Sequence, residues 1–450
     1  MFVSRVDGHN VELPNENHDN TDATMRFSFR LAELVNYQPD PKKRPGVIKA
    51  ICEYTGLDRH QVAALLRNEV KNIPLSAISR LCDYLVEHGH ATAEQLPGAL
   101  FAIEPENFWE LLARRKRLEL CVGVRRTDQP DWPDGAWVVA SDLVLIGEVL
   151  NGVSTLGGTA KLRTADVPVA TSPMANVHAA VVPGAAGSAE KGGATSPAAR
   201  PHPEHLTQSL VWSPGTGSLE EVIERAKSVY RIYSDSAGDK SLVCLGSTKS
   251  NPVVELVVAS AFGCEPFQPQ TEVVEPSQRK CPFYLRFRDH DPRPISCFGG
   301  VELSEKHPST APGIYFEQAD GTWTSSSCDE PTKDAAFVFY AHRESQGWLE
   351  MAMFGFSGRA TRLLAKTLAT RAEEFWPPVY SGYGLQIGAY VIEYSLPTES
   401  DVLLDMLRTD LIANATIRPL DSEIFRRRLE PASATKESGK DKSKPLAKAR

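Results

Sequence analysis

The chain has 450 residues, enough for two or three domains, and 42% of them are hydrophobic, which is typical of a soluble globular protein. It contains no run of eighteen apolar residues, and its N-terminus is polar, so we expect neither a transmembrane helix nor a signal peptide. The net charge of −8 excludes a protein that is basic over its whole surface, but a local basic surface is compatible with it.

Eight cysteines are scattered along the chain without a CxxC pair, and several of them lie within apolar patterns. This distribution predicts reduced, buried thiols in a cytoplasmic protein, because disulfide frameworks and zinc sites have characteristic cysteine spacings. The sequence therefore predicts neither a metal site nor another cofactor.

The first 24 residues are polar and are expected to be disordered. Phe27, Leu31, Leu34 and Val35 then predict a first helix. The basic cluster at residues 42–44 follows in a proline-containing loop, where it either contacts phosphates or is simply solvated.

The clearest pattern of the chain runs from Pro45 to Leu85, where three helical patterns follow one another closely. Gly56 can end the first helix in the left-handed conformation, and Asp58 with Gln61 forms a capping box for the second. Two helices joined by a short glycine-containing turn make either a helix-turn-helix or an ordinary helical hairpin. The predicted buried faces are Val47, Ile48, Ile51 and Cys52; then Val62, Leu65 and Leu66; then Leu75, Ile78, Leu81, Cys82 and Leu85.

The run GLDRHQVAALLRNEVKNIPLSAISRLCDYL resembles the lambda-repressor-like, Cro/CI-type (Xre) helix-turn-helix family. The likeness covers roughly residues 27–89, with Asp58 where serine is usual and Asn68-Glu69 where Asn-Gly is commoner. It implies an all-α DNA-binding domain over residues 25–96, whose second helix enters a major groove of double-stranded DNA.

The leading end of such a helix contacts base edges, and its later residues contact phosphates. Gln61 is suited to adenine, and Arg59 to guanine or phosphate. Residues 42–90 carry eight basic and five acidic side chains, a local excess of three positive charges. The predicted DNA contacts are Arg59, His60 and Gln61 for bases, and Arg67, Asn68 and Lys71 for the backbone.

Residues 97–156 predict an α-β-β-α segment that docks on the C-terminal domain. It comprises a helix over 105–113, strands over 118–124 and 136–140, and a helix over 143–153 that Asp142 caps. Residues 157–206 are rich in alanine, proline, glycine and serine, which predicts a flexible linker.

Strands alternate with helices over residues 207–400, which predicts an α/β domain that is Rossmann-like and has a mixed sheet. Residues 401–430 predict a terminal helix, and the basic end, 431–450, is expected to be disordered. The fold class is therefore multi-domain, with an all-α domain, a linker, an α/β domain and a tail.

Two turns between a predicted strand and a predicted helix stand out, LGSTKSNP and FGFSGRAT. Ligands of open α/β sheets bind at the carboxyl ends of strands, and helix N-termini favour anions. Neither turn matches a Walker A, GxGxxG or GxSxG motif, so ordinary tight turns are the alternative. The predicted contacts to a small phosphorylated or nucleotide-like ligand are Gly246, Ser247, Thr248, Lys249 and Asn251, and Gly355, Ser357, Gly358 and Arg359.

No catalytic residue is predicted, because no nucleophile with spaced histidine and aspartate partners can be assigned. Asp289-His290-Asp291 is interpreted as a polar loop, and Glu255 either faces a nucleotide sugar or lies at the surface.

Two hypotheses of different classes follow. The first is a sequence-specific transcription regulator, not an enzyme, that binds DNA as a homodimer and uses the α/β domain to sense a ligand or to dimerise. The second is an enzyme or effector with a nucleotide-handling α/β domain that the helix-turn-helix recruits. A third possibility is that the helical domain binds protein instead of DNA.

Overall fold

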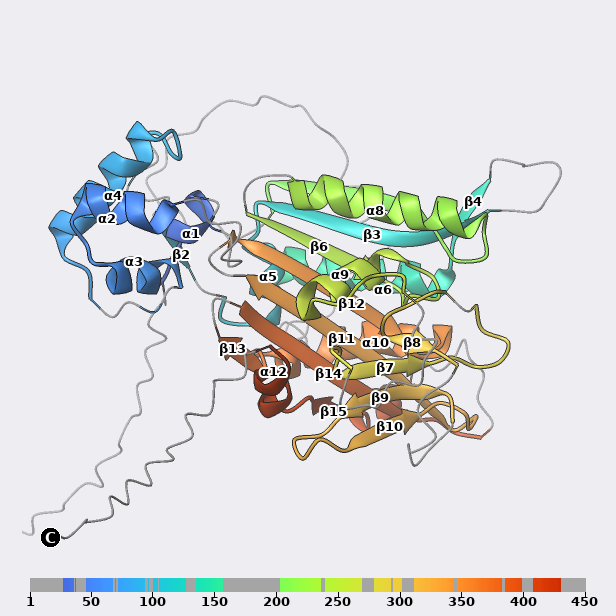
Figure 1. Ribbon diagram of the computed structural model, residues 1–450. Coiled ribbons are helices and arrows are strands. Elements are labelled where there is room, and N and C mark those ends of the chain that lie inside the picture. The colour runs from blue at the N-terminus through green and yellow to red at the C-terminus, as the bar shows by residue number, and fades with distance from the viewer. Residues whose placement is uncertain are drawn as a thin grey trace, which may run out of the picture.

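The computed structural model describes residues 27–35, 37, 46–67, 69, 72–93, 96, 100–103, 105–126, 135–156, 203–235, 239–268, 279–292, 294–301, 311–343, 346–382, 385–398 and 408–429. These residues form a small helical region and a large α/β region (Figure 1). The disorder predicted for residues 1–24, 157–202 and 431–450 lies outside the described residues, as do the predicted DNA contacts Asn68 and Lys71.

The helical region has a core of its own, in which Ile51, Val62, Leu65 and Leu81 are buried together. Its elements are β1 (Phe27–Phe29), α1 (Leu31–Leu34), α2 (Val47–Thr55), α3 (Arg59–Leu66), α4 (Leu75–Glu87) and β2 (Phe101–Ile103). The strand β1 pairs antiparallel with β2.

Two predictions for this region are wrong. Phe27 belongs to β1 and not to a helix, since the apolar-polar-apolar order of Phe-Ser-Phe suits a strand. Leu75 is 81% exposed, because it is the first residue of α4, directly after the N-cap Pro74.

The α/β region is built on a nine-stranded mixed sheet. Its strands are β3 (Arg117–Arg126), β4 (Ala136–Val138), β5 (His205–Trp212), β6 (Lys240–Leu245), β11 (Lys333–Arg343), β12 (Trp348–Gly355), β13 (Tyr380–Gly382), β14 (Leu385–Ser395) and β15 (Thr416–Pro419). The spatial order is β13-β14-β11-β12-β6-β3-β5, with β15 beside β14 and β4 beside the end of β3. The four neighbours β12, β6, β3 and β5 are parallel.

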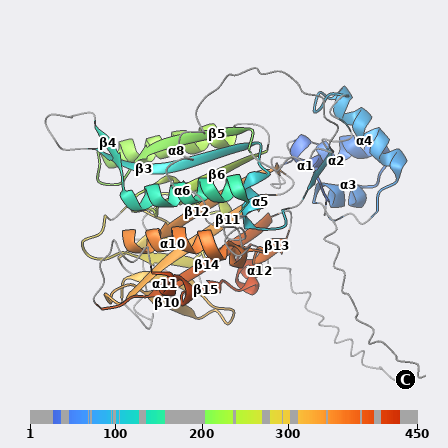
Figure 2. The ribbon, with the colours of Figure 1, turned by 180° about the vertical axis from the view of Figure 1, so that it is seen from behind.

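Helices cover both faces of this sheet. One face packs against α5 (Phe108–Ala113), α6 (Ala140–Thr155), α10 (Gly358–Arg371), the 3-10 helix η5 (Ala372–Phe375) and α11 (Thr409–Ala413); α6 and α10 lie side by side there (Figure 2). The other face packs against α8 (Leu219–Asp235), α9 (Val253–Phe262), α12 (Ser422–Leu429) and a second sheet of β7 (Phe283–Arg286), β8 (Gly299–Gly300), β9 (Gly313–Glu317) and β10 (Trp323–Ser327). None of the helices in the described part of the chain has the length and hydrophobicity that a bilayer crossing requires.

The segment predicted to dock on the C-terminal domain instead supplies an inner strand of its sheet, because β3 pairs with β5 on one side and β6 on the other. The strand β5 begins inside the predicted linker. It is an edge strand whose first four residues are exposed, so it lacks the apolar run that marks a buried strand. Residues 408–429 form two helices and a strand, where one helix was predicted.

Candidate functional site

The helix α3 begins at a complete capping box. The Asp58 Oδ1 accepts the backbone N–H of Gln61 at 2.8 Å, and the Gln61 Oε1 accepts the backbone N–H of Asp58 at 3.1 Å. Two otherwise unpaired donors of the first turn are satisfied in this way, which fixes where the helix starts. The box predicted from the sequence is therefore confirmed.

Arg59, His60 and Gln61 are exposed at the leading end of α3, while Val62 and Leu65 hold the opposite side in the helical core. Arg67 is also exposed, and its Nε donates to Glu69 at 2.8 Å. The capping box uses the Gln61 Oε1, so the two-point contact to adenine expected of a glutamine requires the box to open. The Gln61 Nε2 makes no hydrogen bond with any residue that the structure describes.

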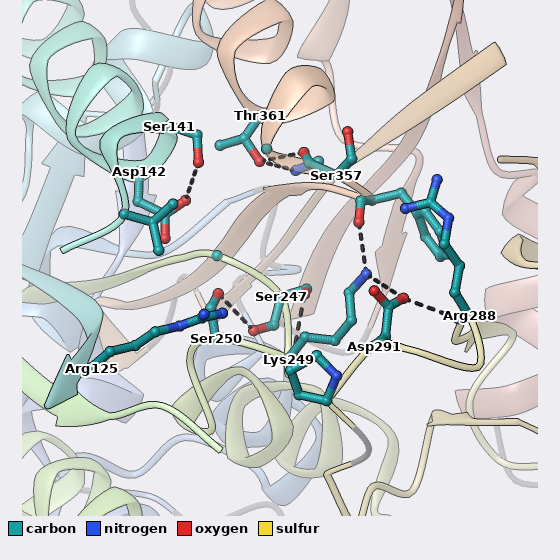
Figure 3. A pocket seen from close by; sticks show the side chains of 16 residues that line it. Arg125, Ser141, Asp142, Ser247, Lys249, Ser250, Arg288, Asp291, Ser357 and Thr361 are labelled. Carbon is teal, nitrogen blue, oxygen red and sulfur yellow. Dashed lines mark hydrogen bonds and ion pairs between the residues drawn. The ribbon is translucent and has the colours of Figure 1, made fainter. Parts of the chain in front are cut away.

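The two glycine turns meet in one pocket of about 260 Å³, at the edge of the sheet where β3, β6 and β12 end (Figure 3). The chain leaves β3 and β12 toward the face of the sheet that α6 and α10 cover. It leaves β6 toward the opposite face, which α9 covers. Such reversals leave a crevice beyond the strand ends, which is where ligands of open α/β sheets bind. The pocket lies there, beyond the end of β6 and beside the N-termini of α6 and α10.

The pocket is lined by polar residues and glycines from five segments of the chain. They are Arg125 of β3; Ser141 and Asp142 of α6; Gly246, Ser247, Lys249 and Ser250 after β6; Arg288 and Asp291 after β7; and Gly355, Ser357, Gly358 and Thr361 around the start of α10. Val139, Pro292 and Phe356 complete the wall.

The turn after β6 depends on two glycines. The backbone φ of Gly246 is +95°, a value that residues with a Cβ rarely adopt. A Cβ on Gly123 of β3 would lie 1.9 Å from the carbonyl oxygen of Ser250, so only glycine allows the turn to pack on β3. The Ser213 hydroxyl donates to the same oxygen at 2.7 Å and holds the turn in place.

The start of α10 satisfies its own donors. The Ser357 Oγ accepts the N–H groups of Arg359 and Ala360 at 3.1 and 3.3 Å and donates to the buried carboxylate of Asp334. The Thr361 hydroxyl donates to the Ser357 carbonyl at 3.0 Å. This helix N-terminus therefore has fewer donors to offer an anion than an uncapped one.

One wall of the pocket carries a charge network. The Lys249 Nζ donates to Asp291 at 3.0 Å and to the carbonyl of Phe356 at 2.7 Å, and it lies 4.2 Å from the centre of the Phe356 ring. The Arg288 side chain donates to the carbonyl of Cys328 at 2.7 Å. Burial lowers the pKa of Lys249, an effect that the neighbouring Asp291 opposes.

Asp142 was predicted to cap α6, and this prediction is wrong: the N-cap is Val139, and Asp142 lies inside the helix. Its side chain is 4% exposed and faces the pocket, where its Oδ1 accepts the Ser141 hydroxyl at 3.3 Å. Burial raises the pKa of Asp142 to about 6, although the Ser141 hydroxyl and the charge of Arg125 act to lower it. Sequence reasoning assigned neither Asp142 nor Arg125 to the site.

Six of the nine predicted ligand-binding residues line the pocket: Gly246, Ser247, Lys249, Gly355, Ser357 and Gly358. Thr248, Asn251 and Arg359 do not line it. The Asn251 side chain is buried and donates to the carbonyls of Cys121 and Leu245 at 2.9 and 3.1 Å, so it joins the ends of β3 and β6. Thr248 is buried and lines a separate small cavity.

Glu255 does not lie at the surface, and it does not line the pocket of about 260 Å³. It is 1% exposed, and its carboxylate accepts hydrogen bonds from Ser296 and from the backbone of Cys297, both at 2.6 Å. It therefore anchors the segment that follows β7. No group of three or more histidine, cysteine, aspartate or glutamate side chains in the described ranges could hold a metal ion.

Comparison with known families decides the nature of the helical region. Residues 47–86 match the model of the Cro/C1-type HTH DNA-binding domain. The N-terminal region contains a Cro/C1-type helix-turn-helix. The match spans α2, α3 and α4 and includes none of the residues around the pocket. Searches of curated proteins and of solved structures gave no match.

Proposed function

We propose that this protein is a sequence-specific transcription regulator that binds double-stranded DNA as a homodimer and responds to a small ligand in the α/β pocket. The observation that carries the proposal is the Cro/C1-type helix-turn-helix, whose α3 exposes Arg59 and His60 at its leading end. In this motif, that end of the second helix meets base edges in the major groove.

The dimer is proposed on grounds of specificity. A single small helical domain reads few base pairs, and two copies on adjacent half-sites roughly square the discrimination between specific and non-specific DNA. Arg67 is the described candidate for a phosphate contact, and such a contact competes with its bond to Glu69.

The sensor part of the proposal rests on the pocket and on its connection to the helical region. The order β5-β3-β6-β12 of the parallel strands supports a Rossmann-like, doubly wound fold, with the pocket where the connections reverse. The strand β12 runs from the turn before Trp348 to Gly355 at the pocket. In that turn, the Gln346 Nε2 donates to the carbonyl of Tyr37 at 3.3 Å, which links the two regions.

We place the regulator in the cytoplasm, where DNA is accessible and thiols remain reduced. All eight cysteines are free, and five of them are buried.

Selection from a random pool of duplex DNA with the intact chain tests the regulator hypothesis. The proposal predicts enrichment of a two-fold symmetric sequence, with half-sites about one helical turn apart. A pool that shows no sequence preference after several rounds would contradict it, and enrichment of a single unpaired half-site would contradict the dimer.

A second candidate function, an enzyme acting on nucleotides, is favoured by one observation. A buried carboxyl group with a pKa of about 6 in a polar pocket is suited to general acid–base catalysis. Incubation with a panel of nucleotides and analysis of the products separates the candidates. Turnover that Asp142→Asn abolishes would establish the enzyme, and binding without turnover supports the regulator.

A further inference from the structure

Resting on the proposed sensor function, we infer that the pocket binds a ribose phosphate, with the sugar hydroxyls on Asp142 and the phosphate on Arg125. The shared chemistry is a hydroxyl pair next to a phosphate. A free pentose phosphate and the sugar-phosphate part of a ribonucleotide both present it.

Asp142 has unfilled acceptor capacity in the pocket. Its Oδ1 takes one hydroxyl, from Ser141, while its Oδ2 points toward Gly246 and lies 3.4 Å from where a Cβ on that glycine would be. The Oδ2 makes no hydrogen bond or ion pair with the residues that the structure describes. A buried carboxylate gains most from donors that complete its hydrogen bonding, and two adjacent hydroxyls can do so together.

The net charge of the pocket lining is positive. Three cationic side chains and two carboxylates line the pocket: Arg125, Lys249 and Arg288 against Asp142 and Asp291. This excess of one positive charge disfavours an amine as the partner of Asp142. It favours a ligand whose donors are neutral and which carries an anionic group elsewhere.

Arg125 is available to bind that anionic group. Lys249 donates a hydrogen bond to Asp291, and Arg288 donates one to the carbonyl of Cys328. Arg125 makes no hydrogen bond or ion pair with any described residue, and its Nε is buried. Its guanidinium lies 5.6 Å from the centre of the Trp137 ring and reaches toward Ser250 (Figure 3). A guanidinium in this state is suited to a two-point contact with phosphate.

Asp142 and Arg125 line the same pocket. The charge of Arg125 acts on Asp142, yet the two side chains do not form an ion pair. The pocket volume of about 260 Å³ lies below the roughly 300–1,000 Å³ of sites for drug-sized ligands. A pentose phosphate can therefore connect both groups, and a nucleobase, if present, extends beyond the pocket.

Isothermal titration calorimetry of the intact protein tests the inference with four probes: ribose 5-phosphate, 2-deoxyribose 5-phosphate, AMP and inorganic phosphate. The deoxy sugar lacks one hydroxyl of the pair. It is expected to bind at least about tenfold more weakly than ribose 5-phosphate, because the hydrogen bonding of the Asp142 carboxylate then stays incomplete. Inorganic phosphate is expected to bind more weakly still. Ribose 5-phosphate binding identifies a free sugar phosphate as sufficient, and binding of AMP alone identifies a nucleotide. Equal binding of the deoxy sugar, or no binding of any probe, overturns the inference.

Two substitutions localise the contacts. Asp142→Asn and Arg125→Gln are each expected to lower the affinity for the bound probe at least about tenfold. The matched controls are the exposed Asp320→Asn and Arg231→Gln, which are expected to leave it unchanged. Circular dichroism shows whether each variant is folded. A folded Asp142→Asn variant that binds ribose 5-phosphate and AMP as the wild type does would overturn the assignment.

Proton linkage gives a readout that misfolding cannot mimic. Hydroxyl donors stabilise the charged carboxylate of Asp142 and lower its pKa, and Arg125 lowers the second pKa of the phosphate, which is ordinarily about 6. Binding at pH 6 should therefore release protons, and Asp142→Asn should release fewer. Phosphate placed beside Asp142 would raise that pKa and cause proton uptake. The other charged groups around the pocket are Arg125, Lys249, Arg288 and Asp291, with the buried Asp334 behind Ser357 and Arg362 near the start of α10. Titration in buffers of different ionisation enthalpy measures the sign, and uptake overturns the inference.

These assays contain no DNA, so they separate the inference from the proposed function. Failure to bind any probe, in a protein that still selects a DNA sequence, overturns the ribose phosphate site alone. Binding of the probe without any effect on DNA affinity supports the site and contradicts the sensor role.

Discussion

The helix α3 of the helix-turn-helix and the pocket are specified by the chain in different ways. The helix α3 and its cap lie within nine consecutive residues, and every contact that starts the helix joins near neighbours. The pocket takes Arg125, Asp142, Lys249, Asp291 and Ser357 from segments spread over more than half of the chain. A local site can be recognised from its residues in order, whereas an assembled site is defined only once the strand order is known.

The two sites also differ in how their charged groups are held. Arg59 and His60 project from α3 and are exposed. Asp142 is buried and Lys249 is largely buried, and burial shifts the pKa of each so as to favour the neutral form. The exposed side chains of α3 can therefore pair with a partner by charge and hydrogen bonds. In the pocket, the ionised form of Asp142 is destabilised by burial, and a ligand that donates hydrogen bonds can stabilise it.

The largest expected effect separates the stabilities of the two regions. In Gly123→Ala, the new Cβ collides with the backbone of Ser250, so we expect the α/β region to lose about 3 kcal/mol of unfolding free energy. The helical region has its own core and should be unaffected. All seven tryptophans follow residue 108, so their fluorescence in urea unfolding reports the α/β region.

Gly147→Ala is the matched control for that substitution. Gly147 lies in α6, and a Cβ there meets nothing within 4 Å, so the variant should gain roughly 0.5–1 kcal/mol. Equal stability of the two alanine variants would contradict the packing described for β3.

The next effect tests whether ionisation of the buried Asp142 destabilises the fold. Its native pKa of about 6 lies above the ordinary aspartate value of 3.8, so its ionisation destabilises the fold as pH rises through this window. Asp142→Asn should therefore stabilise the protein by roughly 3 kcal/mol at pH 7, and the gain should shrink below pH 6 and nearly vanish at pH 4. Urea unfolding at several pH values measures it, and a gain independent of pH would show that the carboxylate is not strained.

A smaller effect separates the fold of α3 from its proposed DNA contacts. Gln61→Glu keeps an acceptor for the Asp58 N–H, so the melting temperature of the helical region should stay nearly the same. A negative charge facing DNA should lower affinity about 10- to 100-fold. Asp58→Ala is the converse control, since it removes the cap and costs about 1 kcal/mol of stability. If Gln61→Glu binds the selected DNA as tightly as the wild type does, the placement of the DNA-facing surface is wrong.

The smallest effect concerns the link between the two sites. Gln346→Ala removes the hydrogen bond to Tyr37, so DNA affinity without ligand should change less than about twofold, while the response to ligand should weaken a few-fold. The exposed Gln208→Ala, on the edge strand β5, is the control. Fluorescence anisotropy with and without ligand measures both, and an unaltered response would place the coupling elsewhere.

Most elements were predictable from the sequence, because periodicity and caps are local signals. The apolar run of β6 and the glycine that ends α9 are examples. The strand β5 was not predictable, since its leading residues are exposed and it is defined by pairing with β3. The position of β3 between β5 and β6 was not predictable either, because it depends on pairing between strands that are distant in the sequence.

The candidate site also has a part that was predictable from local sequence and a part that was not. The glycine turns could be predicted because small residues between a strand and a helix mark a strand end. Their meeting in one pocket requires β6 and β12 to be parallel neighbours. Asp142 was assigned to a cap because its position near a helix start is the local signal, whereas its burial against the turn at Gly246 depends on tertiary packing.

The central claim is that occupancy of the pocket controls DNA binding. Its most direct test is the affinity of the intact chain for its selected DNA, measured by fluorescence anisotropy with and without saturating ribose 5-phosphate. A change of at least about fivefold is expected in the wild type, and a smaller change at the same ligand concentration in Asp142→Asn, whose affinity for the ligand is reduced. The same affinity in both conditions, with calorimetry showing the wild-type pocket occupied, would contradict it.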